Sequence, residues 1–573
     1  MVNKEIADIF EEIADLLEIK GEQPFRVNSY RRAARTLNDL TRDVAALAEA
    51  GELGSLSGIG KSTIGKIEEY LAEGRVSLHA ELLESMPEGL PALLDIQGLG
   101  PKRVAQMWRE LGVDNIEGLK ETIASGKLAE LKGMGSKSVA QIAAAIAFAE
   151  KSAGRTPLGL AWPLATELAA AMEKVKGVGR VAICGSVRRG CETVGDLDLL
   201  CESTNGKAVI EAFTAMPQVR RTLAAGETKA SVLVARRDGD EMQADCRVVP
   251  QESFGAALQY FTGSKEHNVR LREIASKKGW KLNEWGLFSG SRRLAGKDEV
   301  AIYKKLGLPS IPPEVREDRG EFDVEAPLRL VEQADIRGDL HLHTTASDGT
   351  ADAEAMARAA EERGYDYIAV TDHSRSSTIA NGLSIDLMWR QIEKIRKLNK
   401  KLDATTVLTG CEVDILSDGS LDYPDQLLAA CEFVVASVHV AMRQSRDKVT
   451  ARVLAAMESP YVTAIGHPTG RLLGRREPMD LDMEAVIAKA AETGTALELN
   501  AAWQRLDLND RHARMARESG VMICLSTDAH STAQYDQMKY GLATARRAWL
   551  RPDDVLNTRP LPALRKWVAK KRG

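Results

Sequence analysis

The chain of 573 residues contains no apolar run near the ~18 residues that a membrane-spanning helix needs. Its seven cysteines are an odd number and form no Cys-x-x-Cys pair, which favours reduced thiols in the cytoplasm over a disulfide framework. The first residues, MVNKEIADIFEEI, are acidic and amphipathic, so we expect no secretory signal. No heptad repeat marks an oligomer interface, and we expect a monomer that contacts no membrane.

An overall positive charge is also missing, because the formal net charge is −5 at pH 7. The whole-chain charge therefore gives no indication of nucleic-acid binding. Local basic stretches exist nevertheless: Lys265 to Lys305 contain eleven Lys or Arg against five Asp or Glu, and PFRVNSYRRAAR and the final RKWVAKKRG add two more. Each is either a DNA-binding surface or a solvated helix face, and charge alone does not decide.

Three related segments lie in residues 1 to about 155, where apolar spacing predicts short helices. They are LSGIGKSTIGKI, LLDIQGLGPKRVAQM and LAELKGMGSKSVAQI. Each places two glycines in a tight turn that opens into a helix, where exposed backbone N–H groups favour a phosphate. The pattern is typical of helix-hairpin-helix modules, which hold the DNA backbone without recognising its sequence. The expected DNA-binding glycines are Gly58, Gly60, Gly98, Gly100, Gly133 and Gly135.

The segment ICGSVRRGCETVGDLDLL begins a region of mixed α/β character. Asp196 and Asp198 are two apart on a predicted strand, so both carboxylates leave the same face. Asp245, in QADCRVV, can join them from a neighbouring strand. Three carboxylates that hold two Mg²⁺ or Mn²⁺ ions are the arrangement for in-line phosphoryl transfer. An acidic pair alone is usually a surface turn, but the third acid favours catalysis.

A turn ten residues before the acidic pair supports this interpretation. Gly185 and Ser186 open a turn whose backbone and hydroxyl can receive a triphosphate, helped by Arg188 or Arg189.

Six of the nine histidines lie in the C-terminal part at the ends of hydrophobic strand-like runs, with three acids beside them. From Arg337, strand and helix alternate about every 30 residues. About seven such units predict a closed parallel barrel with its site at the C-terminal strand ends. A structural metal site would be a closed four-ligand cage, so nine ligands favour a catalytic centre that binds Mn²⁺ or Zn²⁺. The nine are His341, His343, Asp348, His373, Glu412, His439, His467, Asp528 and His530.

Two motifs carry a family resemblance: GSVRRGCETVGDLD resembles the palm of family X DNA polymerases, and YFTGSKEHNVRLR (Tyr260 to Arg272) resembles their nucleotide-binding segment. SYRRAA and GIGKSTIGKIEEY are similar to their small DNA-binding domain, and the C-terminal part resembles a polymerase-and-histidinol-phosphatase (PHP) domain. The combination resembles bacterial family X enzymes over essentially the whole chain. It implies a multidomain α plus α/β fold, with a helical helix-hairpin-helix region, a nucleotidyltransferase palm with a thumb, and a distorted (βα)7 PHP barrel. The implied domains are a small helical, lyase-like DNA-binding domain (1–85), helix-hairpin-helix fingers (86–155), palm (156–250), thumb (251–318), linker (319–336) and PHP domain (337–573).

The resemblance also implies residue roles. Asp196, Asp198 and Asp245 would bind the catalytic metals. Tyr260 and Phe261 would wall a sugar pocket that rejects a 2′-hydroxyl, although both could instead be core residues. His267 would be a helix-surface or DNA contact. The implied nucleotide-binding residues are Gly185, Ser186, Arg189, Gly195, Tyr260, Phe261, Gly263, Asn268 and Arg272, of which Asn268 would meet the incoming base and Arg272 the template.

In PHP proteins the nine ligands divide among three metals, and the resemblance implies the same division here. His341, His343, Glu412 and Asp528 would hold the first ion, Glu412, His439 and His467 the second, and Asp348, His373 and His530 the third. The expected chemistry is hydrolysis of a phosphate ester. From charge alone, Arg471 and Arg475 could hold the phosphate.

Two departures from the family limit the inference. An extra triphosphate-contacting arginine of animal relatives is absent from TPLGLAW, so triphosphate affinity could differ. Lys66 aligns with the family's Schiff-base lysine, but Ser62 stands at a basic helper position and Phe25 replaces a polar neighbour. A nucleophilic lysine needs a lowered pKa, so Lys66 is either a lyase nucleophile, a phosphate contact or a solvated residue.

The sequence thus predicts a bacterial, cytoplasmic, nucleoid-associated repair polymerase that uses dNTPs on gapped or nicked DNA. The PHP domain would add a Mn²⁺-dependent 3′→5′ exonuclease, with abasic-site cleavage or trimming of blocked 3′ ends. One alternative is a DNA-end-binding nuclease or scaffold with an inactive palm. Another is a PHP domain that hydrolyses small phosphate monoesters.

Overall fold

The described part of the chain forms two compact units, one mainly of residues 1–153 and the other mainly of residues 154–573. The computed structural model describes residues 2–40, 44–56, 58–96, 99–152 and 154–573. Among these residues, no helix combines the length and the apolar character that crossing a membrane requires.

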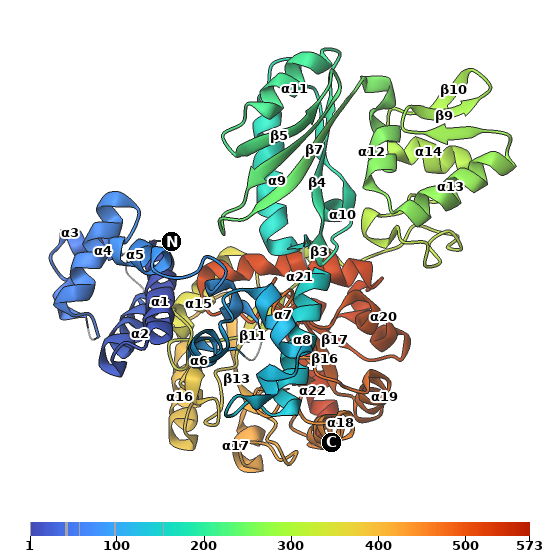
Figure 1. Ribbon diagram of the computed structural model, residues 1–573. Helices are drawn as coiled ribbons and strands as arrows, with labels where there is room; N and C mark the ends of the chain where they lie inside the picture. Colours follow the sequence, from blue (N-terminus) through green and yellow to red (C-terminus); the bar gives the residue numbers. More distant parts are fainter. Residues whose placement is uncertain (1, 41–43, 57, 97–98, 153) are drawn as a thin grey trace. The chain divides into compact units, whose positions relative to one another are not determined.

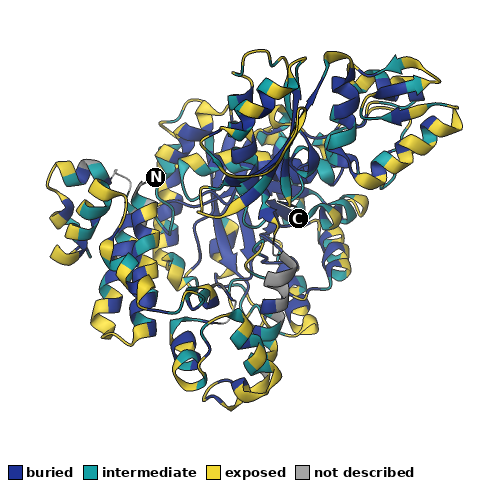
Figure 2. Cartoon of the chain, turned by 45° about the horizontal axis from the view of Figure 1, so that its top comes forward, coloured by how far each residue is buried: buried dark blue, intermediate teal, exposed yellow. Residues whose placement is uncertain are grey.

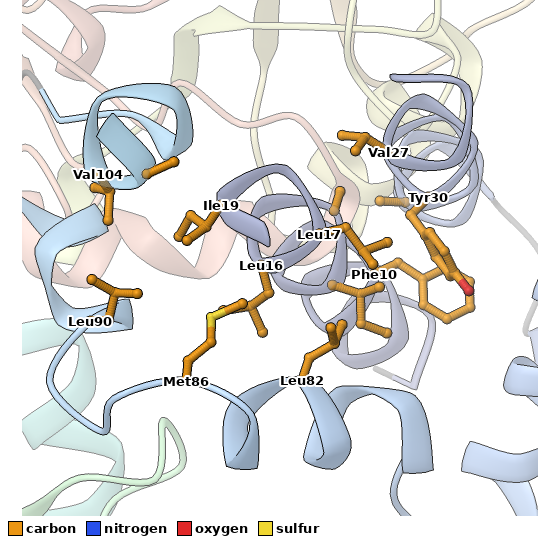
Figure 3. Packing of buried hydrophobic residues seen from close by; sticks show 14 of the residues in the cluster. Phe10, Leu16, Leu17, Ile19, Val27, Tyr30, Leu82, Met86, Leu90 and Val104 are labelled. Carbon is orange, nitrogen blue, oxygen red and sulfur yellow. The ribbon is translucent and has the colours of Figure 1, made fainter. Parts of the chain in front are cut away.

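The described residues of the first unit form helices joined by turns and loops, with no β-strand among them. Its helices are α1 (Val2–Lys20), α2 (Pro24–Asp39), α3 (Val44–Glu49), α4 (Lys61–Glu73), α5 (Ser77–Glu84), α6 (Pro101–Leu111), α7 (Ile116–Ala124) and α8 (Ser136–Ser152). Apolar side chains that recur three and four residues apart on α1 face α2 and α5. Figure 3 shows Phe10 and Leu17 of α1 packed beside Tyr30 and Leu82, and the rings of Phe10 and Tyr30 meet edge to face at 5.7 Å.

The three Gly-x-Gly repeats lie where the sequence predicts turns into helices. Gly60 and Gly100 are the N-caps of α4 and α6, and α8 begins directly after Gly135. Gly58 has a φ of +90°, a conformation that side chains with a Cβ rarely adopt. Gly98, the first glycine of the second repeat, lies outside the described residues.

The second unit begins with a five-stranded sheet in the order β2-β4-β7-β6-β5 (Figure 1). β4 and β7 are parallel, whereas the other neighbours are antiparallel. Alternate apolar residues of β4, β6 and β7 pack against α9 and α11, so the opposite face carries the polar residues of β4. The elements are β1 (Thr156–Pro157), α9 (Leu158–Met172), β2 (Val181–Ile183), α10 (Gly185–Arg188), β3 (Thr193–Val194), β4 (Asp196–Glu202), α11 (Gly206–Thr214), β5 (Val219–Ala225), β6 (Lys229–Ala235) and β7 (Glu241–Val249).

A smaller subregion follows, with three helices beside a three-stranded antiparallel sheet in the order β10-β9-β8. Its elements are α12 (Phe254–Thr262), α13 (Lys265–Lys277), β8 (Lys281–Asn283), β9 (Gly286–Ser289), β10 (Arg292–Ala295) and α14 (Glu299–Leu306). The expectation for His267 is wrong, because its side chain is fully buried. Its ring nitrogens lie 2.8 Å from the Glu321 carboxylate and 2.9 Å from the Tyr303 hydroxyl. Both partners come from outside α13, so the local sequence does not reveal them.

The C-terminal part forms the predicted seven-unit barrel. Its strands are parallel and ordered β11 to β17 in sequence, and a bridge between Leu342 and Ala529 brings the two ends together. Figure 2 shows these strands buried and the outer faces of the surrounding helices exposed. The strands are β11 (Gly338–Leu342), β12 (Tyr367–Val370), β13 (Thr406–Asp414), β14 (Phe433–Ser437), β15 (Ala464–Ile465), β16 (Ala496–Asn500) and β17 (Ile523–Ser526). The helices are α15 (Ala353–Glu362), α16 (Ile385–Leu398), α17 (Asp425–Ala430), α18 (Arg446–Met457), α19 (Met483–Thr493), α20 (Asp510–Glu518), α21 (Met538–Arg547) and α22 (Leu561–Arg572).

Candidate active sites

The first candidate site lies on the five-stranded sheet, where three carboxylates gather. Asp198 of β4 pairs directly with Asp245 of β7 across the parallel ladder, and Asp196 lies one pleat away on the same face. The backbone N–H of Cys184 donates to the Asp198 carbonyl, and the Gln243 amide donates to the Asp245 carboxylate at 2.9 Å. The predicted convergence of two strands on one acidic cluster is therefore present.

The cluster holds more negative charge than its surroundings neutralise. Burial and the neighbouring carboxylates of Asp196 and Asp245 raise the pKa of Asp198 to about 7. Burial and Asp245 also raise the pKa of Asp196. This repulsion is what bound cations relieve, so the donor set fits a divalent metal.

Gly185 is explained by its contact with this cluster. Its φ is +60°, and a Cβ at this position would lie 2.0 Å from Oδ2 of Asp198. Only glycine lets the backbone of the turn approach the carboxylate so closely. Ser186 lies within α10 and Arg189 directly follows this helix, so both are in the turn that the motif predicts.

The metal-free protein should show a pH-dependent effect of Asp198. Its folded-state pKa of about 7 exceeds the ordinary 3.8, so the folded state holds a proton that the unfolded chain releases, and stability falls as pH rises through this window. Asp198→Asn should therefore raise the melting temperature by a few degrees at pH 8 and by less than half as much at pH 5, where only part of the window has been crossed. Thermal unfolding in chelator checks this, with the exposed Glu241→Gln as control. An equal shift at both pH values would contradict the account.

The predicted nucleotide-contacting residues lie on α10, α12 and α13. Tyr260 and Phe261 are half-buried and meet edge to face at 5.2 Å, so neither is fully enclosed core. The Asn268 amide donates to the Tyr260 carbonyl at 2.7 Å, while Arg272 is exposed. Gly195, which directly precedes β4, is exposed and has open space where a Cβ would lie.

The second candidate site lies at the C-terminal ends of the barrel strands. All nine predicted ligands gather there, and three groups have ligand atoms within 4.8 Å of one another. The groups are His343, Asp348, His373 and His530; His341, His343 and Asp528; and His373, Glu412 and His439. His467 approaches Glu412 at 3.0 Å, although none of these groups includes it. His343 and His373 each belong to two of these groups, whereas Glu412 is the only shared ligand in the three-metal division that the resemblance implies.

Several histidine nitrogens face one another in a way that suits cations. Nε2 of His341 lies 3.3 Å from Nε2 of His343, and Nε2 of His439 lies 3.3 Å from Nε2 of His467. Burial, together with His373 and His530, lowers the pKa of His343 to about 3, which keeps its ring in the neutral form that binds metals. A cation between two facing ring nitrogens satisfies both of them, so the donor set fits Mn²⁺ or Zn²⁺.

Two carboxylates that the sequence analysis missed orient these ligands. Asp414 lies 2.5 Å from Nδ1 of His439, and Glu498 lies 2.7 Å from Nδ1 of His341. Each carboxylate accepts from Nδ1–H and directs Nε2 toward the centre of the site. Both are buried acids inside apolar strands, in CEVDIL and ALELN. An acid in such a strand could have indicated a role in the site, because a buried carboxylate needs a partner.

Asp414→Asn should weaken metal binding without removing a ligand. An asparagine cannot fix the His439 ring as firmly, and loss of such a partner typically lowers metal affinity about 10- to 100-fold. Titration of the metal-free chain with Mn²⁺ measures this directly. Asp418→Asn, an exposed neighbour that bonds only Ser420 among the contacts described, is the matched control. Equal Mn²⁺ affinity in both variants would argue against the orienting role.

Arg471 does not face the ligand cluster as a phosphate contact. Its guanidinium donates to both oxygens of Glu192 and to the carbonyls of Arg505 and Leu506. Arg505 is the arginine nearest the cluster in the contacts described, with Nε 3.5 Å from Asp528. Arg475 is exposed.

In the first unit, Lys66 is half-buried on α4. Its Nζ lies 3.4 Å from the Ser62 hydroxyl and 5.9 Å from the centre of the Tyr30 ring. Phe25 is 84% exposed. No cationic neighbour of Lys66 appears among these contacts, so its role as a nucleophile stays a prediction.

Comparison with protein families assigns four parts of the chain. Residues 1–76 match a helix-hairpin-helix domain, 90–147 a SAM-like helix-hairpin-helix tandem, 257–317 the DNA polymerase beta thumb and 339–502 the PHP domain. The chain is 39% identical over 564 residues to the DNA polymerase/3′-5′ exonuclease PolX of Bacillus subtilis (strain 168), covering 98% of each. It is 27% identical over 352 residues to rat DNA polymerase lambda, covering 55% of this chain and 56% of that one. It is 29% identical over 234 residues to a probable phosphatase of Thermoanaerobacter sp. (strain X514), covering 38% of this chain and 89% of that protein.

Proposed function

The chain belongs to the bacterial PolX family of DNA polymerase/3′-5′ exonucleases, and from this membership we propose how its two sites divide the chemistry. It is a DNA polymerase that also carries a 3′-5′ exonuclease. The five-stranded sheet would extend DNA, and the barrel would shorten it. One observation supports this division: an acidic triad and a nine-ligand histidine cluster occupy separate sheets of one chain.

At the sheet, Asp196, Asp198 and Asp245 would hold two Mg²⁺ or Mn²⁺ ions. When bound, such ions activate the primer hydroxyl and neutralise charge on the pyrophosphate. Ser186 would donate its hydroxyl to the triphosphate, and the Arg189 guanidinium would pair with it.

The neighbouring residues would select and position the nucleotide. Tyr260, Phe261 and Gly263 would form the wall against a 2′-hydroxyl. The Asn268 amide, now bonded to the Tyr260 carbonyl, would contact the base, and the exposed Arg272 would contact the template.

At the barrel, the nine ligands would hold three divalent ions, Mn²⁺ or Zn²⁺. Bound ions of this kind supply a nucleophile for phosphate-ester hydrolysis at neutral pH. Glu498 and Asp414 would keep the histidines oriented. The substrate would be a 3′ DNA terminus, with abasic-site cleavage or removal of blocked ends as further activities.

The helix-hairpin-helix repeats of the first unit would hold the DNA backbone. Five of the six predicted glycines are described, at or next to the starts of α4, α6 and α8. Gapped or nicked duplex would be the substrate, used by a monomer in the bacterial cytoplasm at the nucleoid. A lyase role of Lys66 is tested by borohydride, which would trap the Lys66 Schiff base on a 5′-deoxyribose phosphate.

A 5′-labelled primer on a one-nucleotide gapped duplex tests the proposal. We expect extension by one nucleotide with dNTPs and Mg²⁺, and shortening with Mn²⁺ alone. Weaker extension on an ungapped primer–template would support gap filling. Shortening without extension would mean that the sheet only holds DNA and that the chain is a nuclease.

The similarity of the barrel to a probable phosphatase favours one further candidate activity, hydrolysis of small phosphate monoesters. Release of p-nitrophenol from its phosphate ester measures this. Turnover comparable to that on DNA ends would favour a general phosphoesterase, and no turnover would favour a dedicated nuclease.

A further inference from the structure

The turn that carries Arg189 rests directly on the barrel. This palm turn, residues 189–192, joins α10 to β3. Gly190 has a φ of +66°, and a Cβ there would lie 2.7 Å from the Cβ of Ala543 on α21. The backbone of the palm turn therefore packs on a helix of the other catalytic domain with no space between them.

Arg547, in the last turn of α21, binds the palm turn by hydrogen bonds. Its side chain is only 9% exposed, and Nη1 donates to the Arg189 carbonyl at 3.0 Å and to Oε1 of Glu317 at 2.8 Å. Nη2 pairs with Asp510 at 3.1 Å. A buried arginine whose planar guanidinium meets three acceptors outside its own helix has little freedom to move.

The same Glu317 oxygen also receives the Arg189 side chain. Nε of Arg189 donates to Oε1 of Glu317 at 3.0 Å, and Nη1 donates to the Thr262 carbonyl at 2.5 Å. Glu317 and the Thr262 carbonyl thus hold the Arg189 guanidinium near the triad. There its positive charge offsets part of the rise that burial and the neighbouring carboxylates cause in the pKa of Asp198. Arg547 fixes Arg189 twice, through its carbonyl and through the carboxylate that its side chain contacts.

A second arginine of the barrel holds the other end of the palm turn. Arg471, four residues after the ligand His467, forms two hydrogen bonds with the Glu192 carboxylate, at 2.7 and 3.2 Å. The palm turn is therefore held at both ends by side chains of the barrel. None of these contacts involves any of the nine predicted ligands.

We infer that Arg547 is a positioning residue of the polymerase site: from the exonuclease domain it fixes the Arg189 guanidinium for the triphosphate of the incoming nucleotide. The inference rests on the proposed role of Arg189. In this arrangement the barrel is a structural part of the dNTP site, in addition to its own activity. Pre-organisation of this kind lowers the cost of binding, because the guanidinium does not have to be ordered when the nucleotide arrives.

Steady-state incorporation on a one-nucleotide gap tests the inference, with exonuclease assayed on the same full-length preparations. Arg547→Met should raise the KM for dNTP about tenfold and change kcat by less than about threefold, because misplacement of a binding group weakens substrate contact. Arg547→Lys, which keeps the charge, should recover part of the loss. Glu317→Gln should also raise KM, and should add little in the double variant with Arg547→Met, because both act on one group.

The matched control is Arg546→Met. Arg546 is the adjacent residue of α21 and pairs with Glu314 at 2.7 Å and with the Val331 carbonyl, but not with Arg189. It should leave KM unchanged.

Two outcomes would overturn the inference, and a third would overturn the proposed function on which it rests. An unchanged KM in Arg547→Met overturns it. An equal loss of incorporation and exonuclease also overturns it, since that result marks a general packing defect. Absence of incorporation by the parent chain would overturn the proposed polymerase function itself, which distinguishes the two failures.

Discussion

Asp198→Ala should reduce nucleotide incorporation by at least about 10³-fold and leave exonuclease activity within about twofold of the parent. Burial and the carboxylates of Asp196 and Asp245 raise the pKa of Asp198 to about 7, and bound cations relieve this repulsion. Its removal would leave two acids to hold two ions. Single-turnover extension of a gapped duplex at saturating dNTP measures the loss.

The control for this substitution lies on the same sheet. Glu241 is an exposed acid at the start of β7, and Glu241→Ala should incorporate nucleotides as the parent does. Incorporation by Asp198→Ala within tenfold of the parent would show that the triad is not the catalytic centre.

His341→Ala should have the opposite effect. Mn²⁺-dependent shortening should fall at least about 10³-fold, while gap filling remains, because the barrel loses a buried ligand that faces His343 and contacts Asp528. Bound Mn²⁺ should also fall, as measured by metal analysis after desalting. The loss of metal is a second readout that does not depend on activity.

His512 provides the control for the barrel. It lies on α20, in the same barrel, and belongs to none of the ligand groups among the described residues. His512→Ala should keep both its Mn²⁺ and its exonuclease. Full exonuclease in His341→Ala would contradict a catalytic role for the cluster.

The sequence was most informative for features that depend on residues close together in the chain. Asp196 and Asp198 share a face because strands alternate, and the Gly-x-Gly turns open helices because glycine permits their φ angles. The histidines predicted the barrel because parallel strands end on one side. In each case the local residues determine the local geometry.

It was least informative where partners are far apart in the chain. The buried His267 ring contacts Glu321 and Tyr303, and Arg471 binds Glu192, which is 279 residues away. The sequence analysis expected a surface or DNA contact for His267 and, from charge alone, a phosphate contact for Arg471, whereas packing against distant residues decides the partners of both. β5 likewise carries no periodic signal in the sequence, because VRRTLAA is an edge strand whose residues are mostly exposed and show no alternation.

The central claim is that one chain carries two separable active sites. The most direct measurement runs the parent, Asp198→Ala, His341→Ala and the double variant side by side on a 5′-labelled gapped primer, with Mn²⁺ and with or without dNTPs. We expect extension to disappear only where Asp198 is changed, shortening to disappear only where His341 is changed, and the double variant to leave the primer intact. Loss of both activities from either single substitution would contradict the two-site account.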